Sequence, residues 1–231
     1  MIHPLARHLH LVIKACLEYG LDSCLSGEQS LQRSGMRAFF RHIYPSLKRL
    51  IDCLVSAALL VVFLLPMVAT WVAVRMTSEG PGLFWSKRVG RNGQVFSMPK
   101  FRTMTSCSKV MSRELATEAD CRLTPIGGFL RRSSLDELPQ LWSVFMGHMS
   151  LIGPRPVLPE DRAATLRASC ERTMAVRPGI TGLAQVNGRN FVTPRRKARY
   201  DAFYAREMCL MLDAKIALTT LGMLHRTDLV K

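Results

Sequence analysis

The stretch of sequence that decides the fold runs from Cys53 to Val74 and reads CLVSAALLVVFLLPMVATWVAV. Its 22 residues include no charged side chain. A straight helix of this length would extend roughly 33 Å, enough to cross the ~30 Å hydrocarbon core of a bilayer, whereas a core helix of a small domain needs fewer apolar residues. The run begins more than 50 residues into the chain and no small-residue cleavage site follows it, unlike a signal peptide. We therefore predict a membrane segment.

The same stretch is compatible with two arrangements in the membrane. Pro66 removes one helical hydrogen bond and clashes with the preceding turn, which predicts a kink. Basic residues flank the run: Arg37, Arg41, Lys48 and Arg49 before it, and Arg75, Lys87, Arg88 and Arg91 after it. Because positive charge marks the cytoplasmic side of a membrane segment, two basic flanks fit a re-entrant helix that enters and leaves on one face; the length fits a simple spanning helix equally well. Asp52, at the start of the run, is expected to pair with Lys48 or Arg49.

The chain is strongly basic. Its 231 residues carry 32 Lys and Arg against 17 Asp and Glu, a net charge of +15, and the pI is about 10.2. Such a charge requires an anionic partner, which by composition alone is a nucleic acid, an acidic membrane surface or a phosphorylated small molecule. The seven cysteines are scattered without C-x-x-C spacing, which argues against a zinc site or a disulfide scaffold and fits a reducing compartment. The 48% hydrophobic content excludes a disordered chain.

We divide the chain into three parts. Residues 1–47 are an N-terminal extension of unassigned role, in which Leu9–Leu17 is either a short amphipathic helix on the membrane or part of a poorly ordered extension. Residues 48–75 are the membrane helix, and residues 76–231 are the soluble domain. From Arg75 onward, 25 Lys and Arg outnumber 13 Asp and Glu, so this part alone carries +12.

The soluble domain is predicted to be of the α+β class and rich in helix. Phe84-Trp85 and Val95–Met104 are typical of short strands, and Arg91-Asn92-Gly93 between them is a good turn sequence, so we expect a β-hairpin. Helices are predicted over 108–119, 137–147, 159–174, 195–208 and 210–224. Loops rich in Gly and Pro lie between them, at Thr124–Gly128, Gly153–Pro156 and Arg177–Gly182.

Two adjacent carboxylates, Asp136 and Glu137, lie in the segment RRSSLDELPQLW (Arg131–Trp142), at the start of a predicted helix. That helix has an apolar stripe at helical spacing, made of Leu138, Leu141, Trp142, Phe145 and Met146. One interpretation is structural, with Ser134 and Glu137 forming a capping box. The other is catalytic: side chains of adjacent helical residues diverge by roughly 100°, so one carboxylate attacks a substrate while the other holds a metal ion. The residues alone leave both interpretations open.

Several cations lie on segments whose backbone is restricted. They are Lys100 and Arg102 on the second strand, and Arg155, Arg177 and Arg189 in loops that contain Gly or Pro. A planar guanidinium on such a backbone suits bidentate binding of phosphate. In a domain of net positive charge, this set predicts a phosphate-rich substrate.

Together these motifs resemble those of the bacterial sugar transferases, the monotopic phosphoglycosyl transferases. The resemblance covers the chain from about Lys48 to its end, and the motifs follow the order of that family. They are KRLID (Lys48–Asp52), RVGRNG (Arg88–Gly93), KFRTM (Lys100–Met104), SLDELPQL (Ser134–Leu141), MSLIGPRP (Met149–Pro156), RPGITG (Arg177–Gly182), QVNGRN (Gln185–Asn190) and LDAK (Leu212–Lys215). So many motifs in order make a chance match an untenable explanation.

The resemblance implies a reaction and the residues that carry it. Such enzymes transfer a sugar 1-phosphate from a UDP-sugar to undecaprenyl phosphate and release UMP, with ping-pong kinetics through a covalent phosphosugar–aspartate intermediate. By resemblance, Asp136 is the nucleophile, Glu137 holds Mg²⁺ and Asp201 lies near the metal site. The positions that contact phosphate or nucleotide, or lie on the strand under the site, are Arg131, Arg155, Arg189, Lys100 and Arg102.

The resemblance also implies a location. The segment around Pro66 would re-enter the cytoplasmic leaflet of the bacterial inner membrane beside interfacial amphipathic helices, where UDP-sugar, undecaprenyl phosphate and membrane lipids meet. The reaction would be the first membrane step of exopolysaccharide, O-antigen, capsule or glycoprotein glycan synthesis, with downstream glycosyltransferases as further partners. Nucleic acid is excluded, because the 10 Phe, 4 Tyr and 3 Trp form no stacking cluster. A catalytically inactive family member that acts as a membrane scaffold is the alternative.

A few residues depart from the pattern of the family. Leu65 precedes the proline where Ser is usual, and Lys87 stands in place of a frequent acid. Ala184 replaces a common Trp, and Pro194-Arg195-Arg196 occupies positions of acidic and aromatic residues. The last two changes lie near the expected nucleotide-sugar pocket, so the sugar stays unassigned, although the QVNGRN motif favours an N-acetylated amino sugar. The oligomeric state is unassigned as well.

Overall fold

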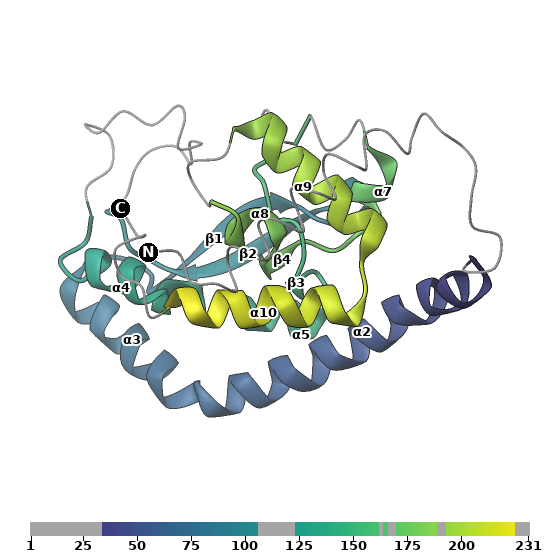
Figure 1. The fold of residues 1–231 in the computed structure, drawn as a ribbon. Helices are drawn as coiled ribbons and strands as arrows, with labels where there is room; N and C mark the ends of the chain where they lie inside the picture. The colour runs from purple at the N-terminus through teal and green to yellow at the C-terminus, as the bar shows by residue number, and fades with distance from the viewer. Residues whose placement is uncertain (1–33, 106–122, 162–163, 166–169, 189–192, 225–231) are drawn as a thin grey trace. The chain divides into compact units, whose positions relative to one another are not determined.

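The structure is a computed structural model in which a defined part of the chain is described. The described residues are 34–105, 123–161, 164–165, 170–188 and 193–224 (Figure 1). The chain divides into two compact units, Met1–Pro45 and Ser46–Lys231, and the candidate site lies in the second. Leu9–Leu17, the predicted helix 108–119 and Arg189 lie outside the described residues.

Two apolar helices, α2 (Ser34–Val62) and α3 (Leu64–Thr77), follow each other with a break of one residue at Phe63. Their directions differ by 60° between Ile43–Val62 and Leu64–Thr77. Within the described part of the chain, no single helix has both the length and the apolarity to cross a membrane, whereas this bent pair meets both requirements when its two helices are taken together. The structure therefore contains the predicted kink, and a bent pair of this kind fits either a broken span or a re-entrant segment.

The break lies one turn ahead of Pro66, the predicted kink residue. Proline has no N–H to donate to the carbonyl of Val62, and its ring clashes with the preceding turn. Phe63 accordingly leaves the helical path, with φ −91° and ψ 9°. Pro66 is the third residue of α3, where a missing N–H leaves no bond within that helix unmade. The helix then continues normally, with the Met67 N–H donating to the Phe63 carbonyl at 2.9 Å.

The predicted hairpin is confirmed. Strands β1 (Leu83–Val89) and β2 (Val95–Phe101) pair antiparallel, with Leu83 opposite Phe101. Between them η1 (Arg91–Gly93) turns the chain, and Asn92 at φ 54° takes the left-handed conformation that asparagine tolerates. The second strand ends three residues earlier than predicted, because Met104 makes only an isolated bridge to Leu123.

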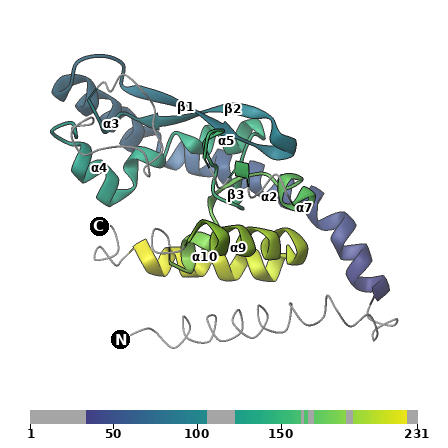
Figure 2. The same ribbon diagram turned by 90° about the horizontal axis from the view of Figure 1, so that it is seen from above.

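A second, parallel pair of strands was not predicted. Strands β3 (Ser150–Ile152) and β4 (Gly179–Thr181) lie in segments that the sequence analysis assigned to loops or left outside any element. Their backbones approach closely because Gly179 and Gly182 lack a side chain: a Cβ on either would overlap the backbone of Gly153. Seen from above, the hairpin and helices α9 (Pro194–Glu207) and α10 (Leu210–Leu224) lie on opposite sides of β3 (Figure 2).

The helices confirm part of the prediction. The bounds of α9 and α10 agree with 195–208 and 210–224 to within one residue. The predicted helix 137–147 is instead a 3₁₀ turn, η2 (Leu135–Glu137), followed by α5 (Gln140–Met146). The predicted helix 159–174 is wrong at its start, where 159–161 form a turn, and its described C-terminal part is the short α7 (Glu171–Met174). Two short helices were not predicted, α4 (Gly127–Ser133) and α8 (Leu183–Val186).

Two buried clusters hold these elements on β2. Phe101 packs with Val74 of α3 and Leu130 of α4. Met98 packs with Val144 of α5 and with Met149, which precedes β3. The second strand of the hairpin thus links the bent helix pair at one end to the α5–β3 region at the other, and Lys100 lies between the two clusters.

Candidate active site

The two adjacent carboxylates lie at a sharp corner between α4 and α5. Ser134 ends α4 and begins η2 in the left-handed conformation, with φ 58°. Its side chain makes no capping hydrogen bond, and its carbonyl accepts from the Glu137 N–H at 3.2 Å. The capping-box interpretation is therefore wrong, because the Glu137 side chain is engaged elsewhere.

Glu137 is held by cations. The Lys100 ammonium on β2 donates to Glu137 Oε1 at 2.8 Å, and Arg155 Nη2 lies 3.7 Å from the same oxygen. Both Lys100 and Glu137 are half-buried, whereas Arg155 is largely exposed. The structure thus brings three of the predicted site residues together from β2, η2 and the Gly-Pro-Arg-Pro loop.

Asp136 is the more buried of the two carboxylates. Burial, and then the neighbouring charge of Glu137, raise the pKa of Asp136 to about 6, although Lys100 and Arg131 act in the opposite direction. The effect of burial thus outweighs that of the two cations. Even so, a carboxyl with a pKa of about 6 is about nine-tenths ionised at pH 7, so it can serve as a nucleophile.

A shallow pocket adjoins the carboxylates. Among the described residues that line it, the charged ones are Arg88, Lys100, Glu137 and Arg155, and Gln140 and the glycine that opens β4 lie beside them. Three cations therefore surround one carboxylate. Burial, and then the positive charge of Arg155, lower the pKa of Arg88, as expected where two guanidinium groups lie close together. An arrangement with surplus positive charge favours an anionic ligand.

Arg88 was not among the site residues predicted from the sequence. It was identified as a basic flank of the membrane segment and as the first residue of the RVGRNG motif, without a role at the site. Its place follows from strand alternation: Arg88 pairs with Phe96, and Phe84 pairs with Lys100, so Arg88 and Lys100 lie on the same face of the hairpin. The three-residue loop Arg91-Asn92-Gly93 sets this register, with the Gly90 N–H donating to the Gln94 carbonyl, and it places Arg88 on the Lys100 face, four residue positions along the hairpin.

Two of the predicted phosphate-binding residues, Arg102 and Arg177, contact the backbone of other elements. Arg102 is buried and donates to the carbonyl and hydroxyl of Ser78, just after α3. Arg177 donates through Nε to the carbonyl of Gly147, which ends α5, at 2.9 Å. Burial first, and then other arginines, lower the pKa of Arg177. Neither guanidinium lines the pocket beside Glu137.

Arg131 and Asp201 are predicted site residues that do not line the pocket beside Glu137. Arg131, on α4, donates through Nε to the hydroxyl of Thr103 at 3.0 Å, and its charge still lowers the pKa of Asp136. Asp201 is buried on α9. Across the described ranges, no three His, Cys, Asp or Glu side chains are gathered closely enough to hold a metal ion, so Asp136, Glu137 and Asp201 do not form such a set.

This donor set is still compatible with magnesium. Mg²⁺ is usually bound by one or two carboxylates together with water and substrate phosphates, rather than by a cage of protein ligands. Asp136 and Glu137 are adjacent carboxylates beside a cationic pocket, so Glu137 can serve as a single protein ligand next to a bound phosphate. The residues therefore fit a metal ion that is shared with a phosphorylated substrate.

Comparison with known proteins agrees with this chemistry. The family model described as bacterial sugar transferase matches residues 43–227. The chain is 36% identical over 203 residues to a UDP-galactose-lipid carrier transferase of Erwinia amylovora, covering 81% of this chain and 42% of that protein. It is 38% identical over 180 residues to a UDP-glucose:undecaprenyl-phosphate glucose-1-phosphate transferase of Klebsiella pneumoniae, covering 75% of this chain and 39% of that protein.

A further relative differs in length. The exopolysaccharide production protein ExoY of Sinorhizobium fredii is 34% identical over 217 residues, which cover 84% of this chain and 95% of that protein. The chain thus spans about two fifths of the first two relatives and nearly all of the third. The match covers the helix pair, the carboxylates and the pocket alike, and the chain therefore belongs to the bacterial sugar transferase family.

Proposed function

We propose that this protein transfers a sugar 1-phosphate from a UDP-sugar to undecaprenyl phosphate at the cytoplasmic face of the bacterial inner membrane. The observation that carries the proposal is the arrangement around Glu137: a pocket lined by Arg88, Lys100 and Arg155, with the buried Asp136 next to it. Surplus cations beside an ionised nucleophile suit attack on a diphosphate. The names of the relatives, which include undecaprenyl-phosphate sugar phosphotransferases, support the same reaction.

The reaction would run in two displacements. In the first, a carboxylate oxygen of Asp136 forms a bond to the phosphorus that bears the sugar, and the bond from that phosphorus to the bridging oxygen breaks, releasing UMP. In the second, a phosphate oxygen of undecaprenyl phosphate attacks the same phosphorus and frees Asp136. Covalent catalysis of this kind divides one difficult displacement into two and gives ping-pong kinetics.

The remaining residues would bind and orient the diphosphate. Arg155 is exposed enough to contact a ligand, while Arg88 and Lys100 lie deeper. Glu137 would hold Mg²⁺, which would supply charge neutralisation to the diphosphate when bound. Asp201 stays a predicted second ligand, and Arg189 a predicted phosphate-binding residue.

The membrane location is supported by apolar side chains that the protein leaves exposed on three helices. They are Leu64, Leu65, Val68 and Trp71 on α3, Trp142, Phe145 and Met146 on α5, and Leu210, Met211, Leu218 and Leu221 on α10. Part of the apolar stripe on α5 is thus exposed, with Trp142 at 51%. Aromatic and aliphatic side chains in this setting suit a helix at the membrane interface. We propose that the bent pair re-enters one leaflet and that α5 and α10 lie at its surface.

The experiment uses the full chain in nanodiscs with Mg²⁺ and undecaprenyl phosphate. A panel of UDP-glucose, UDP-galactose and UDP-N-acetylated amino sugars is assayed for UMP, with and without the lipid acceptor. We expect a single turnover of UMP without acceptor and continuous turnover with it. Release of no UMP from any sugar would overturn the proposal and favour the alternative, a catalytically inactive membrane scaffold. The sugar that gives the highest kcat/KM identifies the donor.

A further inference from the structure

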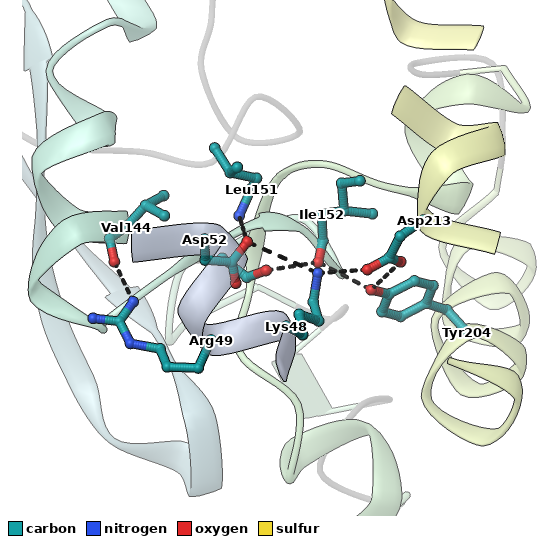
Figure 3. Close-up of polar contacts among 9 residues, drawn as sticks. Lys48, Arg49, Asp52, Val144, Leu151, Ile152, Tyr204 and Asp213 are labelled. Carbon is teal, nitrogen blue, oxygen red and sulfur yellow. Dashed lines mark hydrogen bonds and ion pairs between the residues drawn. The ribbon is translucent and has the colours of Figure 1, made fainter. Parts of the chain in front are cut away.

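One short segment of α2 contacts two elements that adjoin the candidate site, α5 beside Glu137 and β3 beside Arg155. Lys48, Arg49 and Asp52 lie within two turns of this helix, just before its uncharged run. Their side chains extend to α5, to β3 and to α10 (Figure 3). The helix that begins the bent pair is therefore bonded directly to the elements around the pocket.

Arg49 binds the C-terminal end of α5. Its guanidinium donates to the carbonyl of Val144 at 2.6 Å and to that of Phe145 at 2.7 Å. The last carbonyls of a helix have no partner within it and carry partial negative charge, so a cation there stabilises the helix end. Because α5 begins three residues after Glu137, the position of α5 along its axis also sets that of the carboxylates.

Asp52 binds the middle of β3. The Leu151 N–H donates to Asp52 Oδ1 at 3.1 Å. The strand ends at Ile152, and only Gly153 and Pro154 separate it from Arg155. Since proline restricts the backbone on either side of Arg155, the placement of β3 determines where this guanidinium meets Glu137.

Lys48 completes the contact with a buried ion pair. Its ammonium lies 2.6 Å from Asp213 Oδ2 on α10 and 4.0 Å from Asp52 Oδ1, which fulfils the predicted pairing of Asp52 at the outer limit of an ion pair. The Tyr204 hydroxyl lies 2.7 Å from Asp213 Oδ1 and 3.0 Å from the Ile152 carbonyl, so its one proton serves either acceptor. Buried ion pairs rarely add net stability compared with apolar side chains, but they do fix one geometry.

We propose that Arg49 and Asp52 are positioning residues for the transferase reaction, through which the seating of the bent helix pair determines the geometry of Glu137 and Arg155. Neither side chain lines the pocket, and each acts through a backbone group of the element that carries a site residue. The inference rests on the proposed function. It adds that the site is assembled correctly only when α2 is in place.

The test compares truncating and conservative variants of the full chain in nanodiscs. Arg49→Met and Asp52→Leu remove the contacts, whereas Arg49→Lys keeps one donor and Asp52→Asn keeps the oxygen that accepts from Leu151. Arg75→Met is the matched control, because Arg75 also lies at a membrane-helix end and donates to a carbonyl, that of Gly80, remote from α5 and β3. For each variant, kcat and KM of UMP release, the pH dependence of kcat and the melting temperature are measured.

We expect kcat to fall by about 10- to 100-fold in Arg49→Met and Asp52→Leu with little change in KM, because a misplacement of about 1 Å suffices for such a loss. The acid limb of the pH profile should move, Asp52→Asn should retain most activity, and Arg49→Lys should be intermediate. Arg75→Met should keep the wild-type kcat. If a truncating variant does not fold, Arg49→Lys carries the test, because its kcat should fall to an intermediate value while the fold is kept.

Two outcomes separate the inference from the function on which it rests. If the wild type releases UMP and the folded truncating variants match it in kcat and pH profile, the positioning role is wrong. The same holds if kcat falls only in proportion to the fraction unfolded, or if Arg75→Met loses as much. If the wild type releases no UMP, the proposed function fails first.

Discussion

Two clusters of this protein each combine cations with carboxylates, and they differ in how far the opposite charges are matched. Lys48 and Asp52 in the middle of α2 and Asp213 on α10 have side chains 5–10% exposed and are bonded to one another, to Tyr204 or to backbone. Around Glu137, the cations outnumber the carboxylate, and the side chains of the ion pairs are 20–58% exposed. We call the group of Lys48, Asp52 and Asp213 the closed cluster and the group around Glu137 the open cluster. Buried charges that are paired with one another indicate a structural contact, whereas surplus positive charge accessible to solvent indicates a ligand-binding site.

The largest expected effect is a loss of UMP release, caused by a substitution beside the open cluster. Asp136→Asn should lower UMP release by about 10⁴-fold or more, because an amide cannot replace the attacking carboxylate. Intact-mass analysis after incubation with UDP-sugar should show the added sugar phosphate on the wild type and none on this variant. Glu160→Gln neutralises an exposed carboxylate and is the control. An Asp136→Asn enzyme that keeps wild-type turnover would exclude this nucleophile.

The closed cluster predicts a loss of stability. Asp213→Ala leaves the Lys48 ammonium buried without its nearest carboxylate, which costs about 3–5 kcal/mol and lowers the melting temperature by roughly 6–20 °C. Replacing both partners, in Lys48→Met with Asp213→Leu, should recover part of this loss, because the closest ion pair is then removed as a unit while the buried Asp52 loses Lys48 but keeps the hydrogen bond from the Leu151 N–H. If the single and the double variant have the same melting temperature, the ion pair between Lys48 and Asp213 does not stabilise the fold as we infer.

A smaller effect is expected where the open cluster binds substrate. Arg88→Gln should raise KM for UDP-sugar by about 10- to 100-fold, the size of one or two charge-assisted hydrogen bonds, with a smaller change in melting temperature. Arg132→Gln, which removes an exposed cation of α4, should leave KM unchanged. An equal rise in KM for both variants would mean that net charge, and not the pocket, attracts the substrate.

The smallest effect is a shift in pH dependence. Asp136 must be ionised to attack, so single-turnover UMP release should fall as the pH drops through the Asp136 pKa of about 6. Glu137 raises this pKa and Lys100 lowers it. The acid limb should therefore move to lower pH in Glu137→Gln and to higher pH in Lys100→Met, whatever the residual rate. Shifts in the same direction for both variants would contradict the assigned interactions.

The sequence predicts the elements that have strong local signals. The Asn-Gly turn indicates the hairpin, and long periodic segments indicate α9 and α10. The parallel pair β3–β4 has no such local signal, because each strand has only three residues. The strands pair over a long range in sequence, and the glycines at which they approach each other are otherwise typical of loops. Tertiary contact, not local preference, makes these strands.

The structure brings some of the predicted site residues together and places others elsewhere. Residue type and motif indicate Asp136, Glu137, Lys100 and Arg155, and the structure brings these four side chains together or next to one another. Residue type cannot show that Arg102 and Arg177 donate to backbone of the scaffold, since a guanidinium suits a carbonyl as well as a phosphate. That distinction depends on burial, which only the folded chain defines.

The 60° bend at Phe63 also bears on how the chain enters a bilayer. On the proposed topology, both basic flanks stay on the side where the ribosome delivers them, and no polar loop is translocated. Carrying one elementary charge across a potential of 100 mV involves about 2.3 kcal/mol, so export of a basic flank from a cell that is negative inside would be costly. Insertion of this helix pair would then be independent of the membrane potential, and its orientation would be the same in energised and de-energised membranes.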